Sequence, residues 1–316
     1  MIKLSVLCGN ANPVLTAEIC QKLGIKQTEV LVGHFSEGEI RVQIKENIRG
    51  QDVFIVQPTC PPVNDNLMEL LILIDAVRRA SADRITAVIP YYGYARQDRK
   101  DQPRVPITAK LIANLIVAAG ANRVLTMDLH ASQLQGFFDI PVDHLYAINV
   151  LSKYFKERQI EDLVIVSPDV GGIKMARAYA KRLNAGLAIV DKRRMSPEKT
   201  EVMHILGDVK DRNVVMVDDI IATAGSLVDA VIALKNYGAK GIYAAASHGV
   251  LSGPAKDRIA NCKELLEVVI TNSIPLKDGP QNSKIKQLSI APLLAEAIAR
   301  THNAESISSL FEDIRN

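Results

Sequence analysis

The stretch Asn213-Val-Val-Met-Val-Asp-Asp-Ile-Ile-Ala-Thr-Ala-Gly-Ser226 decides how the rest of the chain is interpreted. Residues 214–217 are a short apolar run rich in valine, which predicts a strand buried on both faces. Asp218 and Asp219 lie where that strand emerges, and the small residues 224–226 begin an amphipathic helix. A buried strand that leads through a short loop into a helix is typical of an α/β fold.

The loop between this strand and this helix has the composition of a phosphate site. Small residues let the backbone curl around an anion, and N–H groups at a helix N-terminus point positive partial charge toward it. The carboxylates of Asp218 and Asp219 repel a bare phosphate, so the ligand must also present hydroxyls, a metal ion, or both. A phosphorylated sugar meets this requirement. The alternative is a strand, a solvated turn and Ser226 as an N-cap.

The same pattern occurs in the first half of the 316-residue chain. A strand at 52–56, a helix and a strand at 84–89 repeat the order that starts at Asn213. The repeat and the length predict two similar α/β domains, each with a mainly parallel sheet flanked by helices. Gln57 and Pro58 stand where the second copy has its acid pair, so the sugar-phosphate site is expected in the second domain. The expected domains are residues 1–145, which the tail 300–316 joins, and residues 146–299.

Two segments that follow strands of the first domain lie where α/β folds place ligands. The loop 90–104 is crowded with tyrosines and charges, and Arg96 is predicted to contact a polyphosphate. Alternatives are a solvated basic loop or a subunit contact. A strand over 124–130 would place Asp128 and His130 on one face at its end, where they would hold a metal ion. A histidine that is simply hydrogen-bonded is the alternative, because magnesium prefers oxygen ligands.

The turn Gly33-His-Phe-Ser-Glu-Gly-Glu39 leaves one aromatic ring in an exposed setting. Phe35 either anchors the loop on its own domain or forms a platform for a base or a partner. The turn by itself favours the anchor.

Two loops of the second domain carry further charge. Ser167-Pro-Asp-Val-Gly-Gly172 is an acid-plus-glycine loop at a helix entry, which suits a second anion with a metal ion on Asp169. Asp191-Lys-Arg-Arg-Met-Ser-Pro197 is a cationic tip. It is either ordinary exposed charge or a lid that brings Lys192 and Arg194 onto a transferring phosphoryl group.

The overall composition argues against several classes of protein. A formal charge of +3 is too small to indicate a nucleic acid or a membrane as partner, and the lack of tryptophan argues against a base-stacking platform. Four scattered cysteines without metal-type spacing suggest reduced thiols. No signal peptide or membrane-spanning run is apparent. We therefore expect a cytoplasmic protein.

Together, these motifs resemble the ribose-phosphate pyrophosphokinase family along essentially the whole chain, which implies that both α/β domains are of the phosphoribosyltransferase type. The motifs that occur in the family's order are Phe35-Ser-Glu-Gly-Glu39, Tyr94-Ala-Arg-Gln-Asp98, Met127-Asp-Leu-His-Ala-Ser-Gln-Leu-Gln-Gly-Phe-Phe138, Ser167-Pro-Asp-Val-Gly-Gly172, Asp191-Lys-Arg-Arg194 and the sugar-phosphate stretch. The resemblance implies transfer of the β,γ-diphosphate of ATP to the C1 hydroxyl of ribose 5-phosphate. The products are 5-phosphoribosyl 1-diphosphate and AMP, and Mg²⁺ is the implied cofactor.

The resemblance also implies roles for individual residues and an assembly. The implied assembly is a hexamer built from dimers, in which Phe35 forms an adenine platform contributed across a subunit interface. Implied counterparts of a regulatory site are Arg49, Ser81, Arg104 and Ser308. The implied ATP contacts are Phe35, Glu37, Glu39, Arg96, Gln97, Asp98 and His130. The implied ribose 5-phosphate contacts are Asp218, Asp219, Ala222, Thr223, Ala224, Gly225 and Ser226. The implied diphosphate loop is Asp169, Gly171 and Gly172, the implied metal ligands are His130, Asp169 and Asp128, and the implied catalytic cations are Lys192 and Arg194.

The chain departs from the family pattern at Ala222, where an aspartate is usual. Because Lys192, Arg194 and the implied metal ligands are present, we expect activity to survive with weaker use of ribose 5-phosphate. A catalytically weak or silent sensor of sugar phosphate and nucleotide is the rival from another class, and Ala222 is its best support. A phosphoribosyltransferase is the rival enzyme, but it needs no ATP loop.

Overall fold

The computed structural model of the chain describes residues 2–193, 202–276 and 284–310, which form two units. Of these residues, the first unit contains 2–146, 273–275 and 289–310, and the second unit contains the others. Apart from the short stretch 273–275, the chain returns to the first unit at Ser289. The sequence prediction starts this return later, at residue 300.

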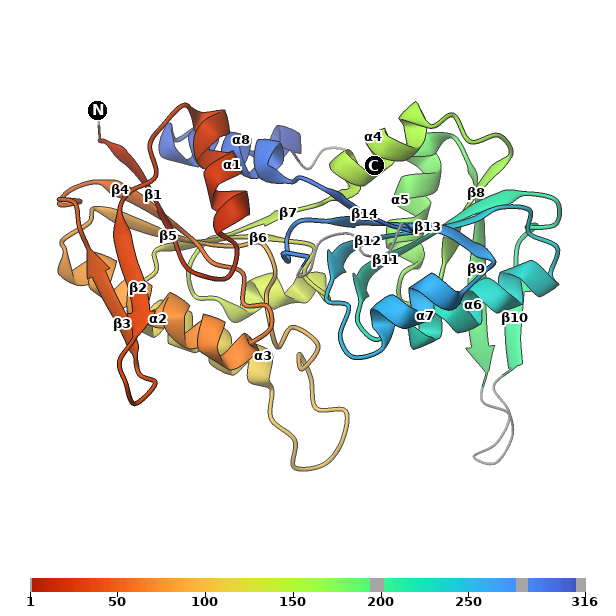
Figure 1. Cartoon of the computed structure of the whole chain (residues 1–316), viewed down its shortest axis with the longest axis horizontal. Helices are drawn as coiled ribbons and strands as arrows, with labels where there is room; N and C mark the ends of the chain where they lie inside the picture. Colours follow the sequence, from red (N-terminus) through yellow and green to blue (C-terminus); the bar gives the residue numbers. More distant parts are fainter. Residues whose placement is uncertain (1, 194–201, 277–283, 311–316) are drawn as a thin grey trace. The chain divides into compact units, whose positions relative to one another are not determined.

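The first unit is built on five parallel strands in the order β1-β4-β5-β6-β7. Figure 1 shows α1 and α8 on one face of this sheet and α2 and α3 on the other. An antiparallel hairpin, β2 (Val30–His34) and β3 (Ile40–Ile44), packs against α2. The sheet strands are β1 (Leu4–Cys8), β4 (Asp52–Val56), β5 (Arg84–Ile89), β6 (Arg123–Met127) and β7 (Val142–Leu145). The helices are α1 (Pro13–Leu23), α2 (Val63–Arg79), α3 (Thr108–Ala119) and α8 (Ala291–His302), with short 3₁₀ turns at Ser132–Phe137 and Ser308–Leu310.

The second unit repeats this design with an extension at one edge. Its sheet has the order β10-β9-β8-β11-β12-β13-β14, in which β10 alone is antiparallel to its neighbour. Helices α4 and α5 cover one face, and α6 and α7 cover the other (Figure 1). The strands are β8 (Leu163–Ser167), β9 (Gly186–Arg193), β10 (Val202–Leu206), β11 (Asn213–Ile221), β12 (Ile242–Gly249), β13 (Leu265–Thr271) and β14 (Ile285–Leu288). The helices are α4 (Ile148–Glu157), α5 (Ile173–Leu183), α6 (Gly225–Asn236) and α7 (Ala255–Asn261).

Strand registers relate the two units residue by residue. Cys8 is the last residue of β1 and pairs with Val56. Val166 is one residue before the end of β8 and pairs with Met216, so the end of β8 lies level with Val217, just as the end of β1 lies level with Val56. Strands β1 and β4 therefore correspond to β8 and β11, and Gln57 corresponds to Asp218. The predicted fold class of two similar parallel α/β units is confirmed.

The predicted central strand of the second unit is buried as expected. Residues 214–217 of β11 are all 2% exposed or less and lie in or beside the apolar core of this unit. Full burial of each such side chain is worth about 1.5–3 kcal/mol. The helix that follows is amphipathic as predicted: it buries Val231 and Leu234, whereas Ile232 between them is 46% exposed.

Several predicted element boundaries are wrong. Strand β11 continues to Ile221 because its ladder with β12 runs on to the pair Ile221–Gly249, so the acid pair lies within the strand. Strand β6 ends at Met127, before the predicted end at His130, because Asp128 takes a left-handed backbone conformation with φ 35°. The sequence pattern also missed β7 and β10. Strand β7 was hidden because it buries the polar residues Asp143 and His144.

None of the helices in the described part of the chain is long and apolar enough to cross a membrane.

Candidate functional site

The predicted sugar-phosphate loop, residues 222–226, links β11 to α6. Ala224 precedes the helix with φ 58° and ψ 11°, a left-handed conformation that turns the chain into α6. The loop carbonyls are held from outside: Ser252 N–H donates to Ala222 O at 2.9 Å, and Arg258 Nη1 donates to Thr223 O at 3.0 Å. The first N–H groups of a helix have no intrahelical acceptors. The structure therefore brings the five loop residues together at a helix N-terminus that suits a phosphate.

Arg258 is a neighbour of this loop that the sequence did not single out. It lies on α7, and its Nη1 would be 3.2 Å from a Cβ placed on Gly225, so a side chain at that position would crowd the guanidinium. A cation beside a phosphate loop strengthens anion binding. In the sequence, nothing distinguishes Arg258 from other exposed arginines, because the contact joins residues 35 positions apart.

The acid pair is electrostatically strained. Asp218 and Asp219 are both half-buried, and the N–H of Asp219 donates to Oδ1 of Asp218 at 2.9 Å. Burial raises the pKa of the Asp218 carboxyl to about 8, and the negative charges of Asp219 and then Asp169 add to the effect. The charges of two neighbouring carboxylates therefore act on Asp218 at this edge of the sheet. A cation or a set of hydroxyl donors would relieve their repulsion.

The predicted diphosphate loop follows β8 directly. Asp169 is exposed, and its Oδ1 accepts from Gly172 N–H at 2.9 Å, while Ser167 Oγ donates to the carbonyl of Asp169 at 2.7 Å. A Cβ on Gly172 would lie 2.7 Å from Ser167 Oγ, so this tight turn needs glycine there. The loop is thus a compact turn that ends at the first residue of α5.

The two predicted cations fall at the border of the described chain. Lys192 belongs to β9, where it pairs with Met203 of β10, and its side chain is not described. Arg194 lies outside the described residues.

In the first unit, Phe35 lies at the tip of the β2–β3 hairpin and is 47% exposed. Its N–H donates to Glu39 O at 2.8 Å, and the guanidinium of Arg41 lies 5.7 Å from its ring centroid. A hydrogen bond from Ser36 lowers the pKa of the Glu37 carboxyl. The turn therefore presents an aromatic ring together with carboxylates at its surface.

The loop between β5 and α3 projects away from its unit in Figure 1. Its base is fixed by Tyr92, which is buried and donates to Ala109 O at 2.9 Å. Arg96 and Gln97 are exposed and Asp98 is half-buried. The three predicted ATP contacts of this loop are thus accessible.

Asp128 and His130 do not share a strand face, so that prediction is wrong. Asp128 is buried and His130 is exposed, because the strand ends before both residues. Between them, the N–H of Leu129 donates to Nε2 of His144 at 2.8 Å, which ties the turn to β7. Within the described ranges, no three His, Cys, Asp or Glu side chains gather into a cluster that would hold a metal ion by themselves.

The implied regulatory residues all lie in the first unit and are exposed: Arg49, Ser81, Arg104 and Ser308. Two of them, Ser81 and Arg104, have left-handed backbone conformations.

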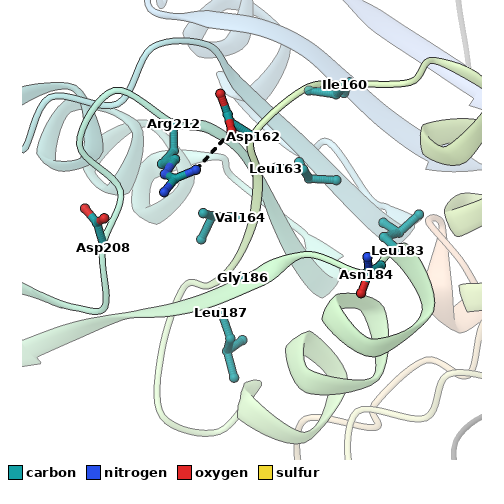
Figure 2. A pocket seen from close by; sticks show the side chains of 10 residues that line it. All are labelled: Ile160, Asp162, Leu163, Val164, Leu183, Asn184, Gly186, Leu187, Asp208 and Arg212. Carbon is teal, nitrogen blue, oxygen red and sulfur yellow. Dashed lines mark hydrogen bonds and ion pairs between the residues drawn. The ribbon is translucent and has the colours of Figure 1, made fainter.

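A pocket of about 570 Å³ lies elsewhere in the second unit (Figure 2). It is lined by the first residues of β8 and β9 and the end of α5, and an ion pair of 3.0 Å joins Asp162 to Arg212 in its wall. The predicted ligand loops follow the opposite, carboxyl ends of the parallel strands, where α/β folds bind ligands. None of the predicted site residues lines this pocket.

Comparison with known proteins identifies relatives of the chain. Residues 4–120 match the family described as the N-terminal domain of ribose phosphate pyrophosphokinase, and residues 193–312 match the phosphoribosyl synthetase-associated domain. The ribose-phosphate pyrophosphokinase of Clostridium perfringens is 55% identical over 313 residues, and that of Caldanaerobacter subterraneus is 57% identical over 309, each alignment covering 98% of both chains. The crystal structure of phosphoribosylpyrophosphate synthetase from Mycobacterium smegmatis superposes with a TM-score of 0.91 at 42% identity, covering 96% of this chain and 99% of that one.

Proposed function

The chain belongs to the ribose-phosphate pyrophosphokinase family, and from this premise we propose that it transfers the β,γ-diphosphate of ATP to the C1 hydroxyl of ribose 5-phosphate, with its second unit holding the acceptor. The products are 5-phosphoribosyl 1-diphosphate and AMP. The observation that carries the proposal is the loop 222–226, where a helix N-terminus, two carboxylates and Arg258 meet. Identity above 50% with relatives of that name over 98% of the chain supports the catalytic role over a silent sensor.

Each part of the acceptor has a matching group in the second unit. The N-terminal turn of α6 suits the 5-phosphate, with Thr223, Ala224, Gly225 and Ser226 around it and Arg258 beside it. Asp218 and Asp219 accept hydrogen bonds from the ribose hydroxyls. The loop of Asp169, Gly171 and Gly172 receives the diphosphate.

Mg²⁺ fits the carboxylates of this edge. The charge of Asp169 acts on Asp218, and oxygen donors with excess negative charge are what this ion prefers. Asp169 would hold one ion, and the exposed His130 of the first unit would associate with an ion on the ATP side. When bound, the ion neutralises charge on the phosphate oxygens.

The remaining roles fall on cations and on the first unit. Lys192 and Arg194 stabilise the charge that develops on the transferring group, because phosphoryl transfer depends mainly on positioning and electrostatics. ATP is contacted by Arg96, Gln97 and Asp98, and by Phe35, Glu37 and Glu39 of a neighbouring subunit in a hexamer built from dimers. We expect the protein to work in the cytoplasm, because the scattered cysteines of its sequence suggest reduced thiols.

The proposal is tested by incubating the protein with ATP, Mg²⁺ and ribose 5-phosphate and measuring AMP and the sugar diphosphate. Equal amounts of both products are expected, with none when ribose 5-phosphate is omitted. Sugar binding without AMP would favour the sensor. Consumption of 5-phosphoribosyl 1-diphosphate by a free base would favour the phosphoribosyltransferase.

A further inference from the structure

The loop between β1 and α1 in the first unit, residues 9–12, holds a carboxylate from within the chain. The main-chain N–H of Asn10 donates to Oε1 of Glu69 at 2.5 Å, and Nδ2 of Asn10 donates to Oε2 at 2.9 Å. Nε2 of Gln57 donates to the same Oε1 at 2.8 Å. Glu69 lies on α2 and is 3% exposed. Both oxygens of this buried carboxylate are therefore bound by N–H donors.

Gln57 completes the arrangement. It is fully buried, and its Oε1 accepts from the main-chain N–H of Ala11 at 3.1 Å. Two successive N–H groups of one loop thus point at side-chain oxygens, as they point at anions in backbone nests. A Cβ on Gly9 would lie 2.2 Å from Gln57 Oε1 and 2.7 Å from Glu69 Oε1, so the close approach of the two side chains requires glycine.

The loop 9–12 of the first unit has the same position in the fold as the diphosphate loop of the second unit. It follows β1 and precedes α1 as the diphosphate loop 168–172 follows β8 and precedes α5. Gln57 corresponds to Asp218, and in the second unit the charge of Asp169 contributes to the raised pKa of Asp218. In the first unit, the carboxylate beside Gln57 is that of Glu69, which accepts hydrogen bonds from the neutral donors of Asn10 and Gln57. Such a buried anion persists because its hydrogen bonds replace those of water.

We propose that the loop 9–12 is a second oxyanion site of this chain, that Glu69 is its built-in occupant, and that the chain binds a free small carboxylate there when this side chain is removed. While Glu69 is in place, it occupies the loop, and no phosphate or diphosphate binds there. The ligand class is a small oxyanion, and formate, the smallest carboxylate, is the probe.

The test is the thermal unfolding of the full chain in about 100 mM sodium formate against the same concentration of sodium chloride, because a ligand that binds the folded state raises Tm by mass action. In chloride, Glu69→Ala is expected to unfold well below the wild type. In formate, its Tm is expected to rise by about 3 °C, as for a gain of about 1 kcal/mol. A crystal of the variant in formate is expected to show the ion on the N–H of Asn10.

Two controls isolate the site. The wild type keeps its own carboxylate, and Glu69→Gln keeps an acceptor oxygen and the side-chain volume, so both are expected to respond equally to the two salts. The proposal is overturned if formate shifts all three proteins alike or leaves Glu69→Ala unchanged. If Glu69→Ala does not fold in chloride, its refolding yield in formate is the readout. Recovery supports the site, and no recovery overturns it.

Discussion

The loop after β1 and the loop after β8 occupy the same place in two similar units, yet they are filled differently. In the first unit, Glu69 and Gln57 cap the loop N–H groups of Asn10 and Ala11. In the second, the corresponding loop carries Asp169 at the surface, and the strand beside it ends in Asp218 and Asp219. The difference shows how one fold can serve two purposes: one copy is closed by its own side chains, and the other leaves its polar groups accessible for the ligand that we propose.

The largest expected effect concerns the β9–β10 hairpin, which extends the sheet of the second unit. If Lys192 on this hairpin stabilises the transferring group, Lys192→Ala should lower kcat about 10³-fold. The dissociation constant for ribose 5-phosphate, measured by titration calorimetry, should stay unchanged. Lys153→Ala on α4, where the side chain is 77% exposed, is the matched control and should keep full activity. Near-normal turnover of the Lys192 variant would remove this lysine from the mechanism.

A smaller effect is expected at the phosphate loop. Arg258→Ala removes a cation and the hydrogen bond to Thr223 O, so the KM for ribose 5-phosphate should rise about 10- to 100-fold. The KM for ATP should change little. Arg212→Ala is the control, because Arg212 lies in the same unit at the pocket of Figure 2. An equal loss in both variants would mean that Arg258 acts through stability alone.

The substitution Ala222→Asp is expected to change the KM for ribose 5-phosphate in the opposite direction. Ala222 is held in the loop by Ser252, and an added carboxylate would give the ribose hydroxyls a further acceptor. We expect the KM for ribose 5-phosphate to fall roughly tenfold, a change of about 1.4 kcal/mol. Initial rates at several sugar concentrations measure this. The interpretation of Ala222 is wrong if turnover and sugar affinity both stay the same.

The smallest expected effect is on stability. The folded protein raises the pKa of Asp218, so its ionisation opposes folding. The resulting loss of unfolding free energy begins near the ordinary pKa of an aspartate and grows until the pH passes about 8. Without ligands, Asp218→Asn should therefore raise the free energy of unfolding at pH 8 and leave it nearly unchanged at pH 4. Asp257→Asn on α7 is the control, and a gain at both pH values would contradict the electrostatic cause.

Much of this comparison could be predicted from the sequence. The buried run 214–217 and the repeat at 52–56 reflect local periodicity, so they predicted both sheets and the contrast between Gln57 and Asp218. Strand β7 and the turn at Asp128 were missed because burial of Asp143 and His144 and a positive φ depend on tertiary partners. Arg258 and Glu69 were missed for the same reason, since each acts on a loop far away in the sequence.

The number of ribose 5-phosphate sites per chain tests whether only the second unit binds the sugar phosphate. Titration calorimetry of ribose 5-phosphate into the full chain should give one site per chain, since only in the second unit do the loops after the first and central strands stay open to a sugar phosphate. The Arg258→Ala variant should weaken that site without creating another. Two sites per chain, or a single site insensitive to changes in the 222–226 loop and Arg258, would contradict the account.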